Sequence, residues 1–192
     1  MSEVIHSQPA FFEDMYKSKS DPWDFENSEY ERNRYRSILD ALEDTLWKSA
    51  LEPGCSVGVL TEGLAPLCER LLALDFSQTA ARTARDRCLR FPKVQVECIG
   101  LGDLNSFSEF DLIVLSEIGY YFTESGWFDL TKRMVNDLQP GSTILVAHWT
   151  GHSDDHQISG DRVHEILMSH PNMKVTRSER HEGFRLERLE RA

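Results

Sequence analysis

Short apolar runs that alternate with helix-like stretches, from about residue 50 onward, constrain the fold of this chain more than any other feature. The runs are short enough to be β-strands, and the stretches between them are long enough to be crossover helices. Such alternation is typical of βαβ units, in which parallel strands form a sheet with helices on both faces. The runs are 50–51, 71–74, 94–96, 112–115 and 144–147, and the helix-like stretches are 59–68, 77–90 and 124–138.

The two ends of the chain depart from this alternation. Near the amino terminus, residues 9–18 are predicted to form a short helix, and Ser28 with Glu31 forms a capping box that begins another helix. Near the carboxyl terminus, a helix is expected over 161–169, and residues 174–180 and 184–189 then flank a Glu-Gly turn. This last pattern predicts an antiparallel hairpin, which is common at the edge of a mixed sheet.

The acidic composition limits the classes of partner. The 192 residues include 21 Lys and Arg against 32 Asp and Glu, which gives a formal charge of −11. Duplex nucleic acid requires a basic face, so we expect no nucleic-acid partner. The sequence shows no apolar run of about 20 residues and no signal peptide, so we expect no membrane association and a cytoplasmic location. The four cysteines form no C-x-x-C pair and are expected to be reduced thiols.

The segment after the first apolar run carries the strongest functional signal. It runs from Glu52 to Gly58, and its glycines, Gly54 and Gly58, let the backbone approach a ligand closely. Asp75 follows the second run about 20 residues later, where an acid accepts hydrogen bonds from ribose hydroxyls. The loop does not match the G-x-G-x-x-G fingerprint of dinucleotide sites, and Glu52 would repel a pyrophosphate. A nucleoside cofactor with cationic groups and no phosphate fits better, and S-adenosylmethionine is such a cofactor.

The same loop also spells G-x-S-x-G, the nucleophile elbow of α/β-hydrolases, with Ser56 as the nucleophile. Acidic residues and His148 follow in the order that a hydrolase triad requires. However, a hydrolase elbow normally follows several earlier strands, whereas the residues before this loop are predicted to be mostly helical. The hydrolase is therefore the weaker alternative.

Further polar positions follow the later strands. Asp103 comes after the third strand, with Leu104 beside it, and is placed to accept a hydrogen bond from an adenine amino group. The alternative is an aspartate that only closes its own turn. Ser116 and Glu117 end the fourth strand, at the sheet edge where ligands bind in open α/β folds. The alternative for Glu117 is a solvated carboxylate at the start of a helix.

A set of motifs in a fixed order along the chain matches one known family. They are Asp21-Pro22-Trp23, Ser28-x-Tyr30-Glu31-x-x-Arg34-Tyr35, Glu52-x-Gly54-Cys55-Ser56-x-Gly58-x-Leu60-Thr61, Asp75-x-Ser77, the run from Phe110 to Glu117, Tyr120-Tyr121, His148-Trp149 and Gly160-Asp161-x-Val163-His164. With these motifs the chain resembles class I S-adenosylmethionine-dependent methyltransferases, and more closely the nodulation N-methyltransferase (NodS-like) family. It departs from the wider pattern at Ser56, where Gly is usual, and at Pro53, where an aliphatic residue is usual.

The resemblance implies a fold and a division of the chain. The fold is α/β, a Rossmann-like doubly wound sheet of seven strands, mostly parallel with an antiparallel C-terminal strand. Residues 1–192 would form a single methyltransferase domain. Within it, residues 1–48 would be a helical N-terminal lid, and residues 49–192 would be the cofactor-binding sheet and the C-terminal hairpin.

The resemblance also implies a site for S-adenosylmethionine, with S-adenosylhomocysteine as the product. Gly54 and Gly58 would pass beneath the methionine portion, with Glu52 near it, and Asp75 would accept from the ribose hydroxyls. The lid would contribute an aromatic cover and an arginine for the cofactor carboxylate, and the adenine would lie between residues after the second and third strands. These further implied contacts are Trp23, Tyr30, Arg34, Ser56, Phe76, Asp103, Leu104 and Ser116.

Methyl transfer from a sulfonium is an in-line displacement that needs alignment, and an amine acceptor must be neutral when it reacts. Glu117 and His148 are the predicted bases, each just after a central strand, although His148 would serve equally to hold a loop. The predicted acceptor pocket is aromatic and is lined by Tyr120, Tyr121 and Trp149, which would otherwise be core residues. The histidines after residue 147 do not have the spacing of a metal motif, so no metal is expected.

The sequence therefore predicts a small-molecule methyltransferase that methylates nitrogen, and the family resemblance implies an amine acceptor such as an amino sugar or glycoconjugate. Two alternatives stay open: an O-methyltransferase of a secondary metabolite, and a methyltransferase-like protein that binds the cofactor without catalysis.

Overall fold

The computed structural model describes residues 9–192, so the first eight residues of the predicted lid lie outside the described residues. The described chain forms two compact units. One extends to Asp103, and the other contains residues 104–192.

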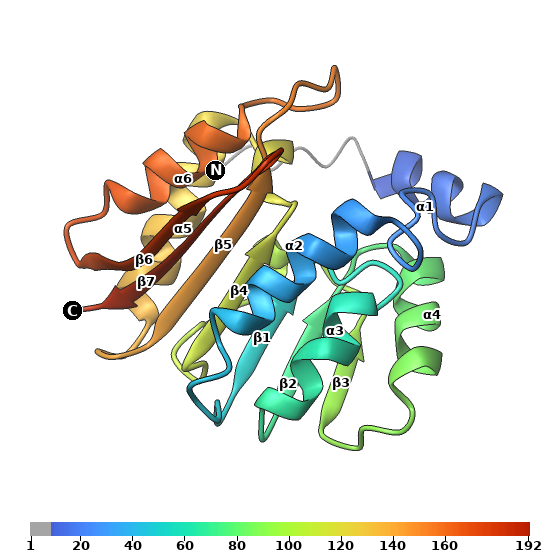
Figure 1. The fold of residues 1–192 in the computed structure, drawn as a ribbon, viewed down its shortest axis with the longest axis horizontal. Helices are drawn as coiled ribbons and strands as arrows, with labels where there is room; N and C mark the ends of the chain where they lie inside the picture. Colours follow the sequence, from blue (N-terminus) through green and yellow to red (C-terminus); the bar gives the residue numbers. More distant parts are fainter. Residues whose placement is uncertain (1–8) are drawn as a thin grey trace. The chain divides into compact units, whose positions relative to one another are not determined.

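The first unit is a parallel three-stranded arrangement with helices (Figure 1). Its strands lie in the order β3-β2-β1, with Ala50 opposite Leu71 and Leu71 opposite Val94. Strand β1 is buried throughout, as expected for a parallel strand that is covered on both faces. The elements are α1 (Pro9–Ser18), α2 (Glu29–Asp40), β1 (Ala50–Pro53), α3 (Val59–Leu64), β2 (Leu71–Leu74), α4 (Gln78–Cys88) and β3 (Val94–Glu97), with 3-10 turns at Ala65–Leu67 and Leu101–Asp103.

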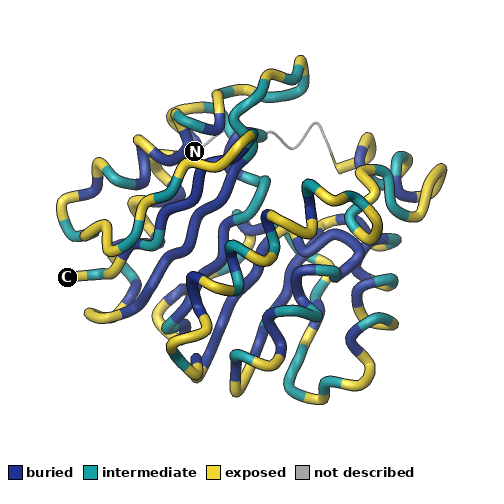
Figure 2. Tube along the Cα trace, in the orientation of Figure 1, coloured by how far each residue is buried: buried dark blue, intermediate teal, exposed yellow. Residues whose placement is uncertain are grey.

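The second unit contains four strands in the order β4-β5-β7-β6. Strands β4 and β5 are parallel, whereas β7 runs antiparallel to both β5 and β6. The long β6–β7 hairpin carries the red end of the chain in Figure 1, and Figure 2 shows that β4 and β5 are buried. The elements are β4 (Leu112–Ser116), a 3-10 turn (Gly119–Tyr121), α5 (Glu124–Asp137), β5 (Thr143–Trp149), α6 (Gly160–Met168), β6 (Met173–Arg180) and β7 (Phe184–Arg191).

The predicted fold class is confirmed: the described residues contain seven strands, mostly parallel, with an antiparallel C-terminal hairpin. The predicted start of α2 is also confirmed, because the Ser28 hydroxyl accepts from the Glu31 amide at 3.4 Å and caps the helix. One helix start differs from expectation. Helix α6 begins at Gly160, one residue earlier than expected, and is capped by Ser159, whereas the Asp161 carboxylate accepts from Arg180 and Arg185.

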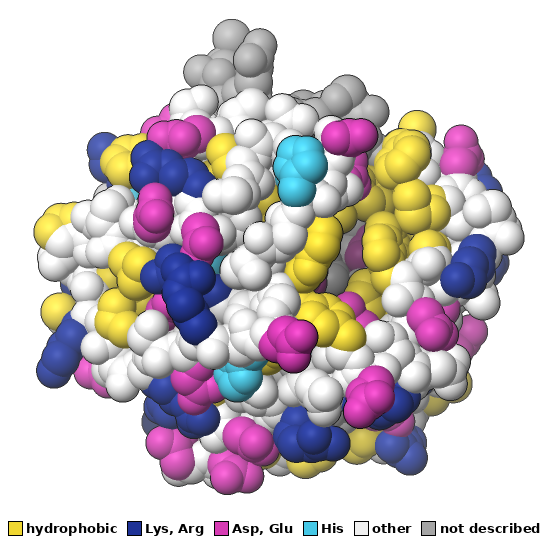
Figure 3. Space-filling model, turned by 45° about the horizontal axis from the view of Figure 1, so that its top comes forward, with side chains coloured by type: hydrophobic (Ala, Val, Ile, Leu, Met, Phe, Trp, Pro, Cys, Tyr) yellow, Lys and Arg dark blue, Asp and Glu magenta, His cyan; other side chains and the backbone are white. Residues whose placement is uncertain are grey.

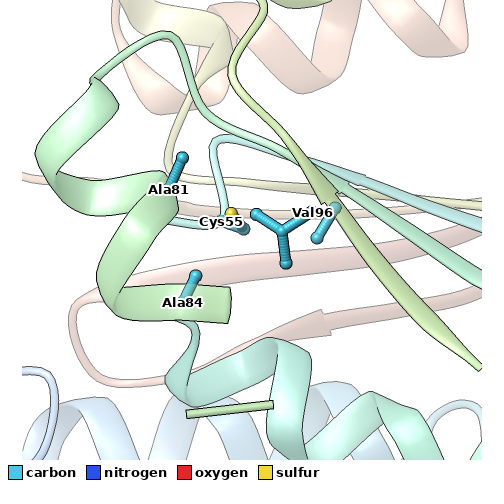
Figure 4. Packing of buried hydrophobic residues seen from close by; sticks show 5 residues of the cluster. Cys55, Ala81, Ala84 and Val96 are labelled. Atoms are coloured by element: carbon cyan, nitrogen blue, oxygen red, sulfur yellow. The ribbon is translucent and has the colours of Figure 1, made fainter. Parts of the chain in front are cut away.

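Small side chains pack the loop after β1 onto α4. Cys55 lies against Ala81 and Ala84 of that helix and near Val96 of β3 (Figure 4). Gly58 lies even closer, since a Cβ built there would be 2.9 Å from Cα of Ala84. Its φ of +82° is also in the left-handed region, so both backbone conformation and space require glycine at this position. These contacts hold the loop against α4.

The described surface carries mixed charge. In Figure 3, acidic and basic side chains are interspersed over the face shown. None of the helices in residues 9–192 has both the length and the apolar character that a membrane span needs.

Two glycine substitutions separate the contributions of conformation and space. Gly58 and Gly141 both have φ above +80°, but a Cβ at Gly141 would meet nothing within 4 Å. Gly141→Ala should therefore lower the free energy of unfolding by only about 1 kcal/mol, the cost of a left-handed alanine. Gly58→Ala should cost more than about 2 kcal/mol, because the α4 backbone cannot move aside cheaply. Urea unfolding measures both, and equal losses would contradict the packing described for the loop.

Candidate active site

The loop between β1 and α3 turns through three left-handed residues. Gly54, Ser56 and Gly58 have φ values of 72°, 52° and 82°. A positive φ at a residue other than glycine is costly and persists where the surroundings enforce it. At Ser56 they do so twice: its amide donates to Asp75 Oδ2 at 2.9 Å, and its hydroxyl accepts from Tyr16 Oη at 2.6 Å.

Asp75, just after β2, is the buried acid to which the loop is bonded. Its Oδ2 accepts from the Ser56 amide, and its Oδ1 accepts from the Ser77 amide at 2.8 Å. Burial nevertheless raises the pKa of Asp75 to about 6, because the two amide hydrogen bonds offset only part of the desolvation. The carboxylate is thus aligned by the backbone and retains acceptor capacity for further donors.

Glu52, at the end of β1, is the second buried acid. It is 3% exposed, and its Oε2 has no hydrogen-bond partner among the described residues. The pKa of Glu52 is raised to about 8, chiefly by burial and further by the charge of Asp75. The Thr61 hydroxyl offsets part of this rise. The structure thus places two buried carboxyl groups beside one glycine-containing loop, at two positions that the sequence analysis named.

Helix α1 contacts this loop and the start of α4 through two residues that the sequence reasoning missed. Tyr16 donates to Ser56, as described above. The Glu13 carboxylate accepts from the hydroxyls of Ser77 and Thr79 and from the Thr79 amide, all within 3.1 Å, at the start of α4. These hydrogen bonds lower the pKa of Glu13 to about 2. The available signal was the i, i+3 spacing of Glu13 and Tyr16, which puts both on one face of the helix.

Aromatic rings connect α1 with two predicted cofactor residues. The ring of Phe12 lies 6.0 Å from that of Trp23 and 5.6 Å from that of Phe76, between centroids. Trp23 and Phe76 are both partly exposed, whereas Phe12 is buried. Sequence reasoning named the two outer rings but missed the one between them.

Two predicted cofactor residues, Arg34 and Tyr30, lie on α2. Arg34 is 1% exposed and forms an ion pair with Glu31 of the same helix, so it is not an ordinary surface charge. Tyr30 is half-buried. Elsewhere in the predicted set, Asp103 closes its own turn by accepting from the Gly100 amide at 3.0 Å, and Leu104 and Ser116 are half-buried.

In the second unit, Glu117 follows β4 in the left-handed region, with φ of 59°. Its Oε2 accepts from Tyr120 Oη at 2.6 Å, and its Oε1 accepts from the Trp149 amide at 2.7 Å. The half-buried carboxylate therefore joins the ends of β4 and β5, and it contacts two of the three predicted acceptor residues.

His148 does not have the geometry of the predicted base. It is 0% exposed, and its Nε2 accepts from the amides of Ile118 and Gly119 at 3.2 and 2.9 Å. A ring nitrogen whose lone pair is already shared by two amides, and which solvent does not reach, cannot take a proton from a bound acceptor. The prediction of a direct base is corrected to a role in holding the turn at residues 118–119.

The predicted acceptor aromatics form one group with a histidine that sequence reasoning did not assign. His156 stacks on Tyr120 with ring centroids 3.7 Å apart, and its ring is also edge-on to Tyr121 and Trp149. Its Nδ1 is buried and has no partner among residues 9–192, and burial lowers its pKa. No group of three or more His, Cys, Asp or Glu side chains in the described part of the chain has the geometry to hold a metal ion.

Comparison with known proteins decides the family. A profile of the Nodulation protein S (NodS) family matches residues 13–148, more than half of the chain. This chain belongs to the NodS family. Nodulation protein S of Bradyrhizobium diazoefficiens is 34% identical over 127 residues, which are 65% of this chain and 61% of that protein. The Rhizobium tropici protein is also 34% identical over 127 residues, 53% of its own length. The chain thus matches little more than half the length of these NodS relatives.

A solved NodS structure shares the fold. The N-methyltransferase NodS from Bradyrhizobium japonicum WM9, in complex with S-adenosyl-L-homocysteine, has a TM-score of 0.83 and is 24% identical in sequence. The similarity covers 95% of this chain and 98% of the solved NodS chain. It therefore extends over both units described above.

The raised pKa of Glu52 predicts a pH dependence of stability. The folded protein retains a proton on Glu52 up to about pH 8, whereas the unfolded chain loses it near pH 4.5. The free energy of unfolding should therefore fall as the pH rises through this window, by up to about 1.4 kcal/mol per pH unit from this group.

Glu52→Gln should remove this dependence. Between about pH 6.5 and 7.5, above the Asp75 transition, the difference in unfolding free energy between Glu52→Gln and the wild type should widen in favour of the variant. Chemical denaturation at the two pH values measures it. A gap that is the same at both would show that Glu52 is already ionised in the folded protein.

Proposed function

We propose that this NodS-family chain is an S-adenosylmethionine-dependent methyltransferase that methylates the nitrogen of a small-molecule amine, such as an amino sugar or glycoconjugate. The observation that carries the proposal is the pair of buried carboxyl groups, Glu52 and Asp75, beside the left-handed loop of residues 54–58. The family relationship and the shared fold support it.

The donor set fits this cofactor. Asp75 is fixed by two amides and still has lone pairs for ribose hydroxyls. Glu52 holds a buried oxygen without a partner, and a cationic group nearby would favour its ionised form. The cofactor, when bound, supplies an activated methyl group on a sulfonium. Gly54 and Gly58 would lie beneath its methionine portion, and Phe76 with Asp103 and Leu104 would lie beside the adenine.

The helices before β1 act as a lid in this proposal, as part of a single domain. Glu13 and Tyr16 attach α1 to the same loop and helix start that hold Asp75. Trp23 continues the aromatic cover through Phe12. Arg34 is buried close to Glu31, so a cofactor carboxylate would have to compete with that partner. The protein would act in the cytoplasm.

Glu117 is the residue proposed to receive the acceptor amine. Its carboxylate is ordered by Tyr120 and the Trp149 amide, and a carboxylate attracts an ammonium and can accept its proton. The rings of Tyr121, Trp149 and His156 surround Tyr120 and provide the flat faces on which sugar rings pack.

The hydrolase alternative has little support. Residues 9–103 contain no histidine that could activate Ser56, and the Ser56 hydroxyl is held by Tyr16. His148 cannot serve, because its Nε2 is occupied by two amides.

Calorimetric titration with S-adenosylmethionine tests the cofactor site. Asp75→Asn should weaken binding at least tenfold, because an amide exchanges one acceptor oxygen for a donor. Asp86→Asn makes the same change at an exposed position of α4 and should leave the affinity within twofold. Absence of binding by the wild-type protein would overturn the proposed function.

Transfer of a labelled methyl group to a panel of amines and matched alcohols then identifies the acceptor atom. Amines, and amino sugars above all, should be methylated. Transfer to alcohols alone would replace N-methylation by O-methylation. Tight cofactor binding without transfer to any acceptor would favour a non-catalytic binding protein.

A further inference from the structure

We propose that a buried relay of His148, His164 and Glu187 holds the turn after β4 and thereby positions the Glu117 carboxylate for the acceptor. The inference rests on the proposed function, since it assigns a purpose to Glu117. His148 and its partners would be positioning residues, because none of them touches the reacting atoms.

The relay is continuous and fully buried. His148 Nδ1 lies 3.3 Å from His164 Nε2, and His164 Nδ1 contacts Glu187 Oε2. All three residues are 0% exposed. They come from β5, α6 and β7, so the relay passes from the sheet to the helix that covers it and back to the hairpin.

The hydrogen bonds determine which nitrogens carry protons. His148 Nε2 accepts from two amides, so it has no proton, and the proton of the neutral ring is on Nδ1. That proton is donated to His164 Nε2, which leaves the His164 proton on Nδ1, facing Glu187. Any other arrangement would place two donors or two lone pairs against each other. Both rings are therefore neutral, and burial independently lowers the pKa of His164.

The far end of the relay is held by charges. Glu187 Oε1 accepts from Arg185 Nε at 2.6 Å and from the Ser178 hydroxyl at 3.1 Å. Arg185 also donates to Asp161 Oδ1 at 3.0 Å. Burial alone would raise the pKa of Glu187, but the hydrogen bond from His164 and the charge of Arg185 bring it below its usual value. Glu187 is thus ionised and keeps the His164 proton on Nδ1.

The near end of the relay determines the position of Glu117. The two amides that His148 accepts belong to the residues directly after Glu117, and the next residue of β5, Trp149, donates its amide to Glu117 itself. The turn also packs tightly on α6, since a Cβ at Gly119 would lie 2.4 Å from Val163. The left-handed φ of Glu117 needs such enforcement.

Burying three polar side chains at this position costs free energy, because each loses its hydration. A buried polar or charged network is often no more stable than apolar side chains of the same volume. What apolar side chains cannot supply is an acceptor for two adjacent amides at a defined point. The retained relay is explained if the position of the Glu117 turn matters for the reaction.

Substitutions at His164 test the relay. His164→Phe removes the acceptor for the His148 proton, and kcat should fall at least tenfold while the affinity for S-adenosylmethionine stays within twofold. His164→Gln should recover most of kcat, because its carbonyl can accept from His148 and its amide can donate to Glu187. If His164→Phe does not fold, Glu187→Gln replaces it, with a severalfold loss of kcat expected. A folded variant with wild-type kcat overturns the proposal.

Nitrogen NMR of the wild-type protein tests the relay without reference to activity. The Nε2 of both His148 and His164 should be unprotonated and both Nδ1 protonated. A proton on His148 Nε2 would overturn the relay. A wild-type protein that binds the cofactor but transfers no methyl group would instead overturn the proposed function, whatever the NMR result.

Discussion

The hydrogen bonds from the Ser56 and Ser77 amides to the buried Asp75 carboxylate are the interaction on which the first unit depends. They join the loop after β1 to the start of α4, across the end of β2. Without them, the strained φ of Ser56 would have little to maintain it. Helix α1 then bonds to the loop through Tyr16 and to the start of α4 through Glu13. The arrangement around Asp75 therefore positions both the loop and the helix that would cover the candidate cofactor site.

The second unit also holds a left-handed residue after a parallel strand, but through a buried histidine. Glu117 also follows a parallel strand and also has a left-handed backbone, but its carboxylate is only half-buried. The backbone after Glu117 is held by His148, whose Nε2 accepts hydrogen bonds from the next two amides. His148 is in turn held by His164 and Glu187. In both units, a buried acceptor of backbone hydrogen bonds sets the geometry of a residue proposed to meet a ligand.

The elements of the fold could be predicted because each depends on local pattern. The runs at 71–74 and 112–115 are apolar enough to be buried strands, and each appears in the structure. The glycine loop and Asp75 could also be predicted from the sequence, since their spacing follows from one βαβ unit. Contacts between distant segments could not be predicted. Tyr16 is 40 residues from Ser56, and Glu187 is 23 from His164, so no local pattern indicates either pair. The burial of His148, which excludes it as a direct base, follows only from packing.

The most direct test of the proposed cofactor site is the number of protons released when S-adenosylmethionine binds at neutral pH. Glu52, with a pKa near 8, is mostly protonated in the free protein, and a cationic ligand beside it should drive the proton off. Calorimetry in two buffers of different ionisation enthalpy measures this release. We expect the wild-type protein to release a substantial fraction of a proton and Glu52→Gln to release much less. Binding with no proton release, or with the same release in the variant, would contradict the proposal that Glu52 faces the cationic cofactor.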